Sequence, residues 1–335
     1  MNVCGIDVSK DSLEVVICKN GKSFKSKTFD NSPKGHKALL KVLKKSKVSH
    51  IGMEATGYYH LDVAIALYDD SHFEVMIINP RAASNFAKAM MQQAKTDEID
   101  AKILAQFVAR MDFVPWTPPA DEVFELRACG RRLVTLTKEK AKAKNQLHAY
   151  TTTERAPNII IDDIKLTISQ IEQQITHLVE HSLKVIKNSE CLKPRYDILI
   201  SMTGVAERTA IKLMGEIGVL SFDMTAKQWV AHAGLYPRAN QSGSSVHKQT
   251  RIGKSGNRYI REALYMGALS ASRYEPHIKA YYHHLIDDNG LAKMQALCAV
   301  MRKMLLSIHS MLKQNQPFNG KRFYVLPEAS VSVAE

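Results

Sequence analysis

Hydrophobic and polar positions change their period several times in the first hundred residues. Short segments with strand-like patterns are followed by longer ones with helical spacing. The pair Asn20-Gly21 is typical of a two-residue hairpin turn, and Ser32 before Pro33 is typical of a helix start. The pattern predicts strands at 3–7, 13–19, 22–29, 48–56 and 73–80, with helices at 32–45, at 57–70 and from Arg81 onward.

Three strands followed by helix, strand, helix, strand and helix is the element order of the ribonuclease-H-like fold. We therefore predict an α/β domain of this kind over residues 1–113. The first and fourth strands are neighbours in this fold, and the closing helix packs beside them. A helical remainder follows, which we divide into residues 114–192, 193–320 and a tail at 321–335.

Four acidic residues fall on these neighbouring elements. Asp7 lies in the first strand, Glu54 ends the fourth, and Asp97 and Asp100 open the following helix. The i,i+3 spacing puts the last two on one helical face, so all four carboxylates can converge. Like charges so close repel each other, and an oxygen-seeking divalent cation, Mg²⁺ or Mn²⁺, relieves the repulsion.

Each acid also has a purely structural explanation. Asp7 can serve the turn at "DVSKDS", and Asp97 and Asp100 suit the first turn of a helix, where acidic side chains stabilise the dipole. Glu54 is harder to explain in this way, because a buried, unpaired charge in an apolar strand is costly.

Residues 114–192 begin with the proline-marked linker "VPWTPPADE" and continue with two long helical patterns. Apolar residues in both step by three and four, which predicts an antiparallel coiled-coil hairpin that turns at "TTERAPN". Packing within one subunit and packing against a dimer partner both fit this pattern. The two seams are Leu126, Cys129, Leu133, Leu136, Ala143, Leu147 and Tyr150, and Ile161, Ile164, Ile168, Ile171, Ile175 and Leu178.

Residues 193–320 open with "DILISMTGVAERTAIKLMGEIG", which fits either a helix-hairpin-helix or an ordinary helical hairpin. A Gly- and Ser-rich stretch with clustered cations follows, and it suits contact with a nucleic-acid backbone. A solvated amphipathic surface is the alternative. The candidate contacts are Arg238, Lys248, Arg251, Lys254, Arg258 and Arg261.

Charge and composition limit the classes of partner that the protein can bind. The 335 residues carry 46 Lys and Arg against 33 Asp and Glu, a net charge of +13, which favours partners that carry phosphate. No apolar run is long enough to span a bilayer, and the N-terminus has no export-signal pattern. The five scattered cysteines suit a reducing cytoplasm. We expect a cytoplasmic protein that binds DNA and does not contact membrane.

Five motifs in combination resemble the DEDD transposases of insertion-sequence family one-ten, which include the pilin-gene invertase Piv and bridge-RNA-guided recombinases. They are "GIDVSK", "GMEATGYY", "KTDEIDAKILA", "GLYPRANQSGSS" and "RIGKSGNRYIREAL". The resemblance covers nearly the whole chain. It implies a bacterial or archaeal DNA recombinase whose first domain is like that of the Holliday-junction resolvases. Asp7, Glu54, Asp97 and Asp100 of this domain would bind metal, and Ser242 of "NQSG" would be the nucleophile. It further implies a guide RNA encoded by the element and a homo-oligomer, a dimer or a tetramer.

Several alternatives remain open at this point. Ser244 and Ser245 flank the candidate nucleophile, and the two parts of the site can meet within one subunit or between subunits. A Piv-like invertase differs from a transposase only in its DNA substrate. A junction-resolving nuclease would hydrolyse strands with water, so Ser242→Ala would leave cleavage intact. In a non-catalytic nucleic-acid-binding scaffold the acids would be structural.

Overall fold

The computed structural model describes residues 2–19, 23–55, 57–92, 94, 96–153, 155–221, 223–242, 246–253 and 255–326. From Arg238 to Arg251 the description is limited to the backbone. The predicted Asn20-Gly21 turn, Lys254 and most of the predicted tail lie outside the described residues. The chain forms two compact units, Met1–Pro118 and Pro119–Glu335.

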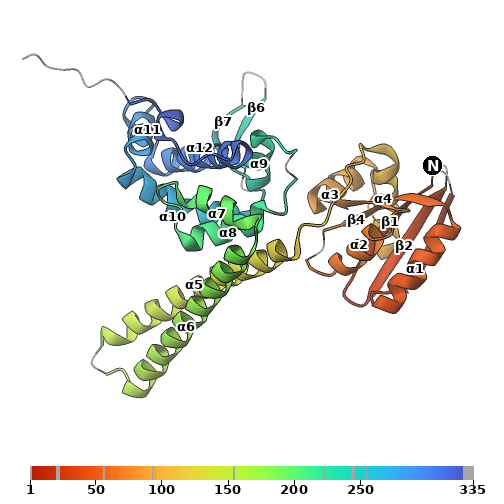
Figure 1. The fold of residues 1–335 in the computed structure, drawn as a ribbon, viewed down its shortest axis with the longest axis horizontal. Helices are drawn as coiled ribbons and strands as arrows, with labels where there is room; N and C mark the ends of the chain where they lie inside the picture. The colour runs from red at the N-terminus through yellow and green to blue at the C-terminus, as the bar shows by residue number, and fades with distance from the viewer. Residues whose placement is uncertain are drawn as a thin grey trace, which may run out of the picture. The chain divides into compact units, whose positions relative to one another are not determined.

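The first unit contains a five-stranded sheet whose strand order, β3-β2-β1-β4-β5, confirms that the first and fourth strands are neighbours (Figure 1). Strands β1, β2 and β3 pair antiparallel, whereas β4 runs parallel to both β1 and β5. The strands are β1 (Asn2–Val8), β2 (Ser12–Lys19), β3 (Ser23–Asp30), β4 (Val48–Glu54) and β5 (Glu74–Ile78).

Both faces of this sheet are buried. Cys4, Ile6 and Val8 of β1 join a core with residues of α1 and α2, and Val3 joins a second core with residues of α3 and α4. This alternation follows from the two-residue period of a strand. The helices are α1 (Pro33–Lys45), α2 (Leu61–Tyr68), α3 (Pro80–Ala89) and α4 (Asp97–Arg110).

The helix ends agree with the sequence patterns in part. Ser32 caps α1 by accepting a hydrogen bond from the backbone N–H of Gly35, as predicted. The helix predicted from residue 57 begins only at Leu61, because Gly57 adopts a positive φ of 56° and a turn precedes the helix. The strand predicted over 73–80 ends at Ile78, since Asn79 caps the next helix.

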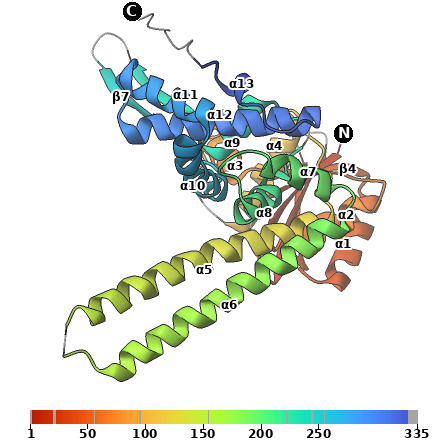
Figure 2. The same ribbon diagram turned by 60° about the vertical axis from the view of Figure 1, so that its left-hand side comes forward.

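The second unit is mostly helical, as expected. Figures 1 and 2 both show α5 and α6 side by side as a long hairpin. A two-stranded antiparallel sheet occupies part of the Gly- and Ser-rich stretch. The elements are α5 (Asp121–Thr151), α6 (Asn158–Asn188), α7 (Leu192–Ile200), α8 (Glu207–Ile217), α9 (Ala226–Ala233), β6 (Pro237–Ser242), β7 (Val246–Ile252), α10 (Arg258–Tyr274), α11 (Pro276–Asp287), α12 (Lys293–Gln314) and α13 (Gly320–Phe323).

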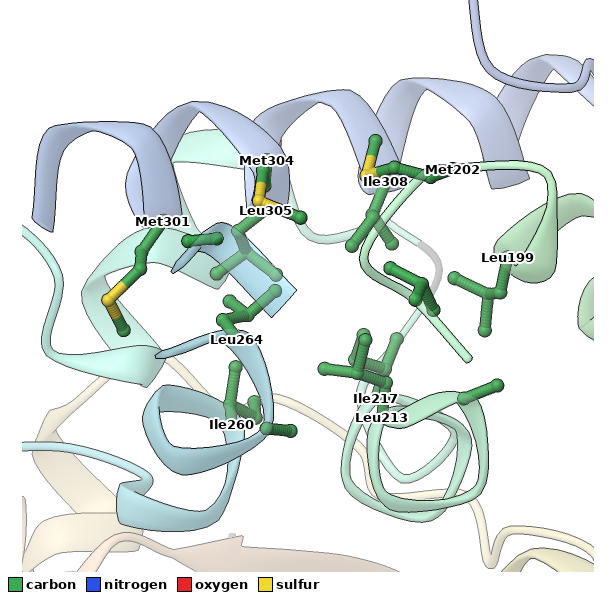
Figure 3. Close-up of a cluster of buried hydrophobic side chains, with 14 of the residues drawn as sticks. Leu199, Met202, Leu213, Ile217, Ile260, Leu264, Met301, Met304, Leu305 and Ile308 are labelled. Carbon is green, nitrogen blue, oxygen red and sulfur yellow. The ribbon is translucent and has the colours of Figure 1, made fainter. Parts of the chain in front are cut away.

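One hydrophobic core runs through the second unit. Figure 3 shows Leu213 of α8, Leu264 of α10 and Met304 of α12 converging in it. Seam residues such as Leu133 and Ile171 belong to the same cluster, so the helical hairpin shares its core with the helices that follow. The division predicted from the sequence, 114–192 and 193–320, is therefore finer than the observed division at Pro118. Coiled-coil packing of the hairpin stays a prediction.

Candidate active site

The candidate acids are assembled by the contact between β1 and α4. A Cβ added to Gly5 would lie under 3.0 Å from backbone atoms of Ala101 and Ala105, so the helix rests directly on the strand. Gly5 and Asp7 lie on the same face of β1 because side chains alternate along a strand. Asp97 precedes Ala101 by one helical turn. The close contact therefore brings the start of α4 towards Asp7.

Glu54 reaches the same place from the neighbouring strand. Gly5 pairs with Gly52 and Ile6 with Met53 in the parallel register of β1 and β4. Continuing this register by one residue puts Glu54 beside Asp7 at the ends of the two strands. Thr96 begins α4 by accepting a hydrogen bond from the N–H of Ile99, so Asp97 and Asp100 lie in the first turn.

The electrostatics of Asp7 show that the four carboxylates share one environment. Burial, followed by the negative charges of Asp100, Asp97 and Glu54, raises the pKa of Asp7 from 3.8 to about 6, against a lowering effect of the Val8 backbone N–H. Repulsion from three other carboxylates would fall if a cation lay among them. The four acids predicted from the sequence are thus brought together in the first unit.

The donor set fits a hard divalent cation, because all four side chains offer carboxylate oxygens. Among the described residues, however, no three His, Cys, Asp or Glu side chains are close enough together to hold a metal ion. The carboxylates crowd Asp7 electrostatically without forming a closed coordination shell.

Ser242 belongs to the second unit and ends strand β6. Its backbone pairs with Val246 across the hairpin, and Arg238 pairs with Arg251 near the other end. Lys248 lies on β7, so three of the predicted nucleic-acid contacts share this hairpin with Ser242. The structure thus adds a two-stranded scaffold for the candidate nucleophile, which the composition of the segment had not indicated.

The two predicted cations on α10, Arg258 and Arg261, differ in their surroundings. The exposed Arg258 donates from Nη2 to the hydroxyl of Tyr259 at 3.1 Å and stacks 4.9 Å from the centre of that ring. Arg261 donates to the backbone oxygen of Ala233 at 2.8 Å and to that of Gly256 at 3.2 Å. Arg258 is available to a phosphate group, whereas Arg261 also holds two backbone segments together.

The turn between α7 and α8 is explained by packing. Gly204 has a φ of 92°, and a Cβ there would meet the carbonyl of Gly267 in α10 at under 3.0 Å. Gly204, the glycine at this turn, is therefore required by the approach of α10. This observation favours the ordinary helical hairpin of the two interpretations.

A polar cluster around Glu216 was not predicted from the sequence. Glu216 is only 2% exposed and accepts hydrogen bonds from Arg127, Arg131 and Asn257. The signal was a single carboxylate in the otherwise apolar "LMGEIG", which is unusual in a buried helix. Its significance depends on Arg127 and Arg131, which lie 89 and 85 positions earlier, so the spacing along the chain does not reveal it.

Similarity to known proteins identifies the family. Residues 4–153 match a DEDD-type IS110 model described as a transposase, and residues 196–283 match the model described as the IS116/IS110/IS902 transposase family. The chain is 30% identical to the pilin gene-inverting protein of Moraxella bovis over 327 residues, which cover 95% of this chain and 97% of that protein. This chain belongs to the IS110 transposase family. Membership of this family implies enzymatic recombination of DNA.

Other similar proteins are more distant. The transposase for insertion sequence element IS1328 of Yersinia enterocolitica is 23% identical over 289 residues, 79% of this chain and 82% of the relative. Among solved structures, Thermus thermophilus RuvC in complex with a Holliday junction substrate matches 32% of this chain and 92% of its own, with 16% identity and a TM-score of 0.27. No helix in the described ranges is both long and apolar enough to cross a membrane.

Proposed function

We propose that this IS110-family protein is a transposase that cuts and rejoins the DNA strands of an insertion sequence. The observation that carries the proposal is the gathering of Asp97, Asp100 and Glu54 around Asp7, whose pKa is raised to about 6 by burial and then by these three charges. A structural protein gains nothing from four repelling carboxylates, whereas a phosphodiester-cleaving enzyme uses them to hold cations.

Asp7, Glu54, Asp97 and Asp100 would hold Mg²⁺ or Mn²⁺. When bound, the metal would offset the negative charge of the phosphodiester that is cut. The protein's part is to fix these four acids on three elements, of which β1 and α4 are locked by the Gly5 contact. This rigidity keeps the carboxylates near the point where the scissile phosphate must lie.

Ser242 would be the nucleophile. Its Oγ would attack the phosphorus, forming a phosphoserine ester as the bond to one deoxyribose oxygen breaks, and the leaving hydroxyl would take up a proton. Attack by a deoxyribose hydroxyl of another strand would reverse this step and release the serine. The energy of the broken linkage is kept in the ester, so strands are rejoined without an external energy source. The cations Arg238, Lys248, Arg251, Lys254, Arg258 and Arg261 would contact the DNA backbone.

The choice of DNA sites would come from an RNA encoded by the element, and a dimer or tetramer would bring two DNA duplexes together. Resemblance to the family supports both parts of this proposal, and the net charge of +13 suits the binding of RNA together with DNA. Site-specific inversion is the second candidate function, favoured by the 30% identity to the pilin gene-inverting protein along nearly its full length.

A plasmid recombination assay tests the proposal. The protein is expressed beside a plasmid that carries its native element with both flanks, and new junctions are counted by quantitative PCR. Asp7→Ala should lower junction formation by at least about 100-fold. Glu98→Ala is the matched control, because Glu98 lies exposed in the same helical turn as Asp97 and Asp100 and should recombine normally. Equal activity of Asp7→Ala and wild type would refute the proposal.

A further inference from the structure

The buried carboxylate of Glu216 joins three elements of the second unit. Arg131 of α5 donates to it with Nε at 2.5 Å and Nη2 at 3.1 Å, and Arg127 donates with Nε at 3.3 Å. Asn257 also donates to it, from Nδ2 at 2.6 Å. Burial alone would raise the pKa of Glu216, but these donors and the two arginine charges outweigh it and lower the pKa. Glu216 is therefore held as a carboxylate.

Asn257 has two roles at once. Its side-chain oxygen accepts hydrogen bonds from the N–H groups of Tyr259 and Ile260 and so caps α10. Its backbone N–H donates to the carbonyl of His232, the penultimate residue of α9, at 2.7 Å. The residue thus joins the end of α9 to the start of α10, and these are the two helices between which the β6–β7 hairpin is inserted.

The base of that hairpin is packed tightly. The backbone N–H of Gly253 donates to the carbonyl of Tyr236 at 2.9 Å, and a Cβ on Gly253 would overlap the Tyr236 ring. A Cβ on Gly256 would lie 2.6 Å from the backbone nitrogen of Gly234 and closer still to the carbonyl of His232. The two chains at the base are therefore held to each other at Tyr236 and Gly253, and the outgoing chain is packed against the end of α9 at Gly256, next to Asn257.

We infer that the Glu216–Asn257 hydrogen bond is a positioning device that sets the direction of the Ser242-bearing hairpin relative to α5 and α8. This inference rests on the proposed function, since it assigns the position of the nucleophile. Arg127 and Arg131 fix Glu216 to α5, Glu216 fixes Asn257, and Asn257 fixes the base of the hairpin. Glu216 and Asn257 act through Ser242 and contact no reacting atom.

The length of the hairpin makes its base important. A strand rises about 3.3 Å per residue, so Ser242 lies about 17 Å from Pro237, and a tilt of about 10° at the base would move it by about 3 Å. A displacement of about 1 Å at a reacting group can cost about 100-fold in rate. Figure 1 shows β6 and β7 projecting from their unit, so contacts at the base of the hairpin determine where Ser242 lies.

A donor–acceptor exchange tests the inference. Asn257→Asp keeps the oxygen that caps α10 but turns a carboxylate oxygen towards Glu216, which breaks the bond by repulsion. Glu216→Gln alone replaces the carboxylate with an amide, which faces Asn257 with either its NH2 donor or its uncharged carbonyl oxygen. The double variant restores one hydrogen bond with the roles exchanged, because the new amide at position 216 can donate to the new carboxylate at position 257 and still accept from Arg131. Glu275→Gln is the matched control, a second buried glutamate of this unit that caps α11.

Four quantities are measured on the full-length protein: junction formation at saturating DNA, DNA affinity, the thermal midpoint, and amide hydrogen exchange of peptides spanning Pro237–Ile252. Asn257→Asp should lose at least about 10-fold in junction formation at saturating DNA and exchange faster at the hairpin, and its DNA affinity should also fall because Arg238, Lys248 and Arg251 lie on the same hairpin. The double variant should recover all three quantities. Glu275→Gln should change only the thermal midpoint.

The inference is overturned if Asn257→Asp recombines normally or if the double variant fails to recover. It is also overturned if Glu275→Gln, with a comparable fall in thermal midpoint, loses junction formation to the same extent as Asn257→Asp. The hydrogen-exchange measurement distinguishes failure of this inference from failure of the proposed function. If Ser242→Ala proves fully active, the proposed nucleophile is wrong, while faster hairpin exchange in Asn257→Asp that is reversed in the double variant still supports the link. Unchanged exchange in Asn257→Asp refutes the link whatever the activity.

Discussion

Gly5 of β1 and Ala101 of α4 approach so closely that a Cβ on the glycine would come within 3.0 Å of the alanine carbonyl. This contact places the acidic first turn of α4 beside Asp7. It explains why a glycine stands two residues before the first acid of the cluster. The geometry of the candidate site thus depends on a position that carries no functional group.

Gly5→Ala should therefore damage the site and the fold together. The added methyl group meets backbone atoms that cannot move aside, so we expect a loss of about 3 kcal/mol or more in the free energy of unfolding, measured by urea denaturation. Gly52→Ala is the matched comparison on the paired position of β4, where the nearest atoms belong to the side chains of Val108 and Ile78. An equal loss in both variants would contradict this account of the contact.

The pKa of Asp7 predicts a stability change with a definite sign. Because folding raises this pKa from 3.8 to about 6, the folded state binds more protons between these values, and the free energy of unfolding falls as pH rises through that range. Asp7→Asn removes this penalty. Because Asp7 is half-exposed, we expect the free energy of unfolding of the variant to exceed that of the wild type by on the order of 1 kcal/mol at pH 7.5. We expect no difference below about pH 4. Thermal unfolding at both pH values measures this, and a variant destabilised at pH 7.5 would contradict it.

Divalent cations should stabilise the wild-type protein through the acidic cluster. A ligand at 100 times its dissociation constant adds about 2.7 kcal/mol to the free energy of unfolding, so the thermal midpoint should rise with Mn²⁺ or Mg²⁺ concentration. Asp7→Asn and Asp100→Asn should abolish the rise, whereas Glu98→Gln should retain it. If Asp100→Asn responds like the wild type, Asp100 is not a ligand.

Arg258 and Arg261 should give different phenotypes. Arg258→Ala removes an exposed cation, so DNA affinity should fall for all sequences alike and the salt dependence of binding should decrease by about one unit. Arg261→Ala removes donors to Ala233 and Gly256, so the free energy of unfolding should fall by about 1–2 kcal/mol. Filter binding across a salt series and thermal unfolding separate the two effects, and identical profiles would contradict this assignment.

The first unit was largely predictable because its patterns are local. Strand and helix periods, the Ser32 cap and the strand order all follow from short windows of sequence and from one known arrangement of elements. The acids could be located because the three elements that carry them, β1, β4 and α4, are adjacent in that arrangement. The early start assigned to α2 failed because Gly57 bends the chain just before it, which residue spacing does not show.

The second unit was less predictable for a physical reason. Glu216 and Arg131 are bonded to each other across 85 positions, and Asn257 lies 41 positions further on. No local pattern reports such a network. The β6–β7 hairpin was equally hidden, because its Gly, Ser and Asn residues are typical of loops and its two strands carry no apolar alternation.

The central claim is that the acidic cluster and Ser242 together cut and rejoin DNA. It is tested most directly by trapping the covalent intermediate on a DNA substrate with a nick close to the cleavage site, followed by mass spectrometry of the protein–DNA adduct. The account predicts a DNA phosphate on Ser242 that requires divalent metal, is absent in Ser242→Ala and Asp7→Ala, and persists in Glu98→Ala. Strand cleavage by Ser242→Ala at the wild-type rate, with no adduct on the wild-type protein, would contradict it.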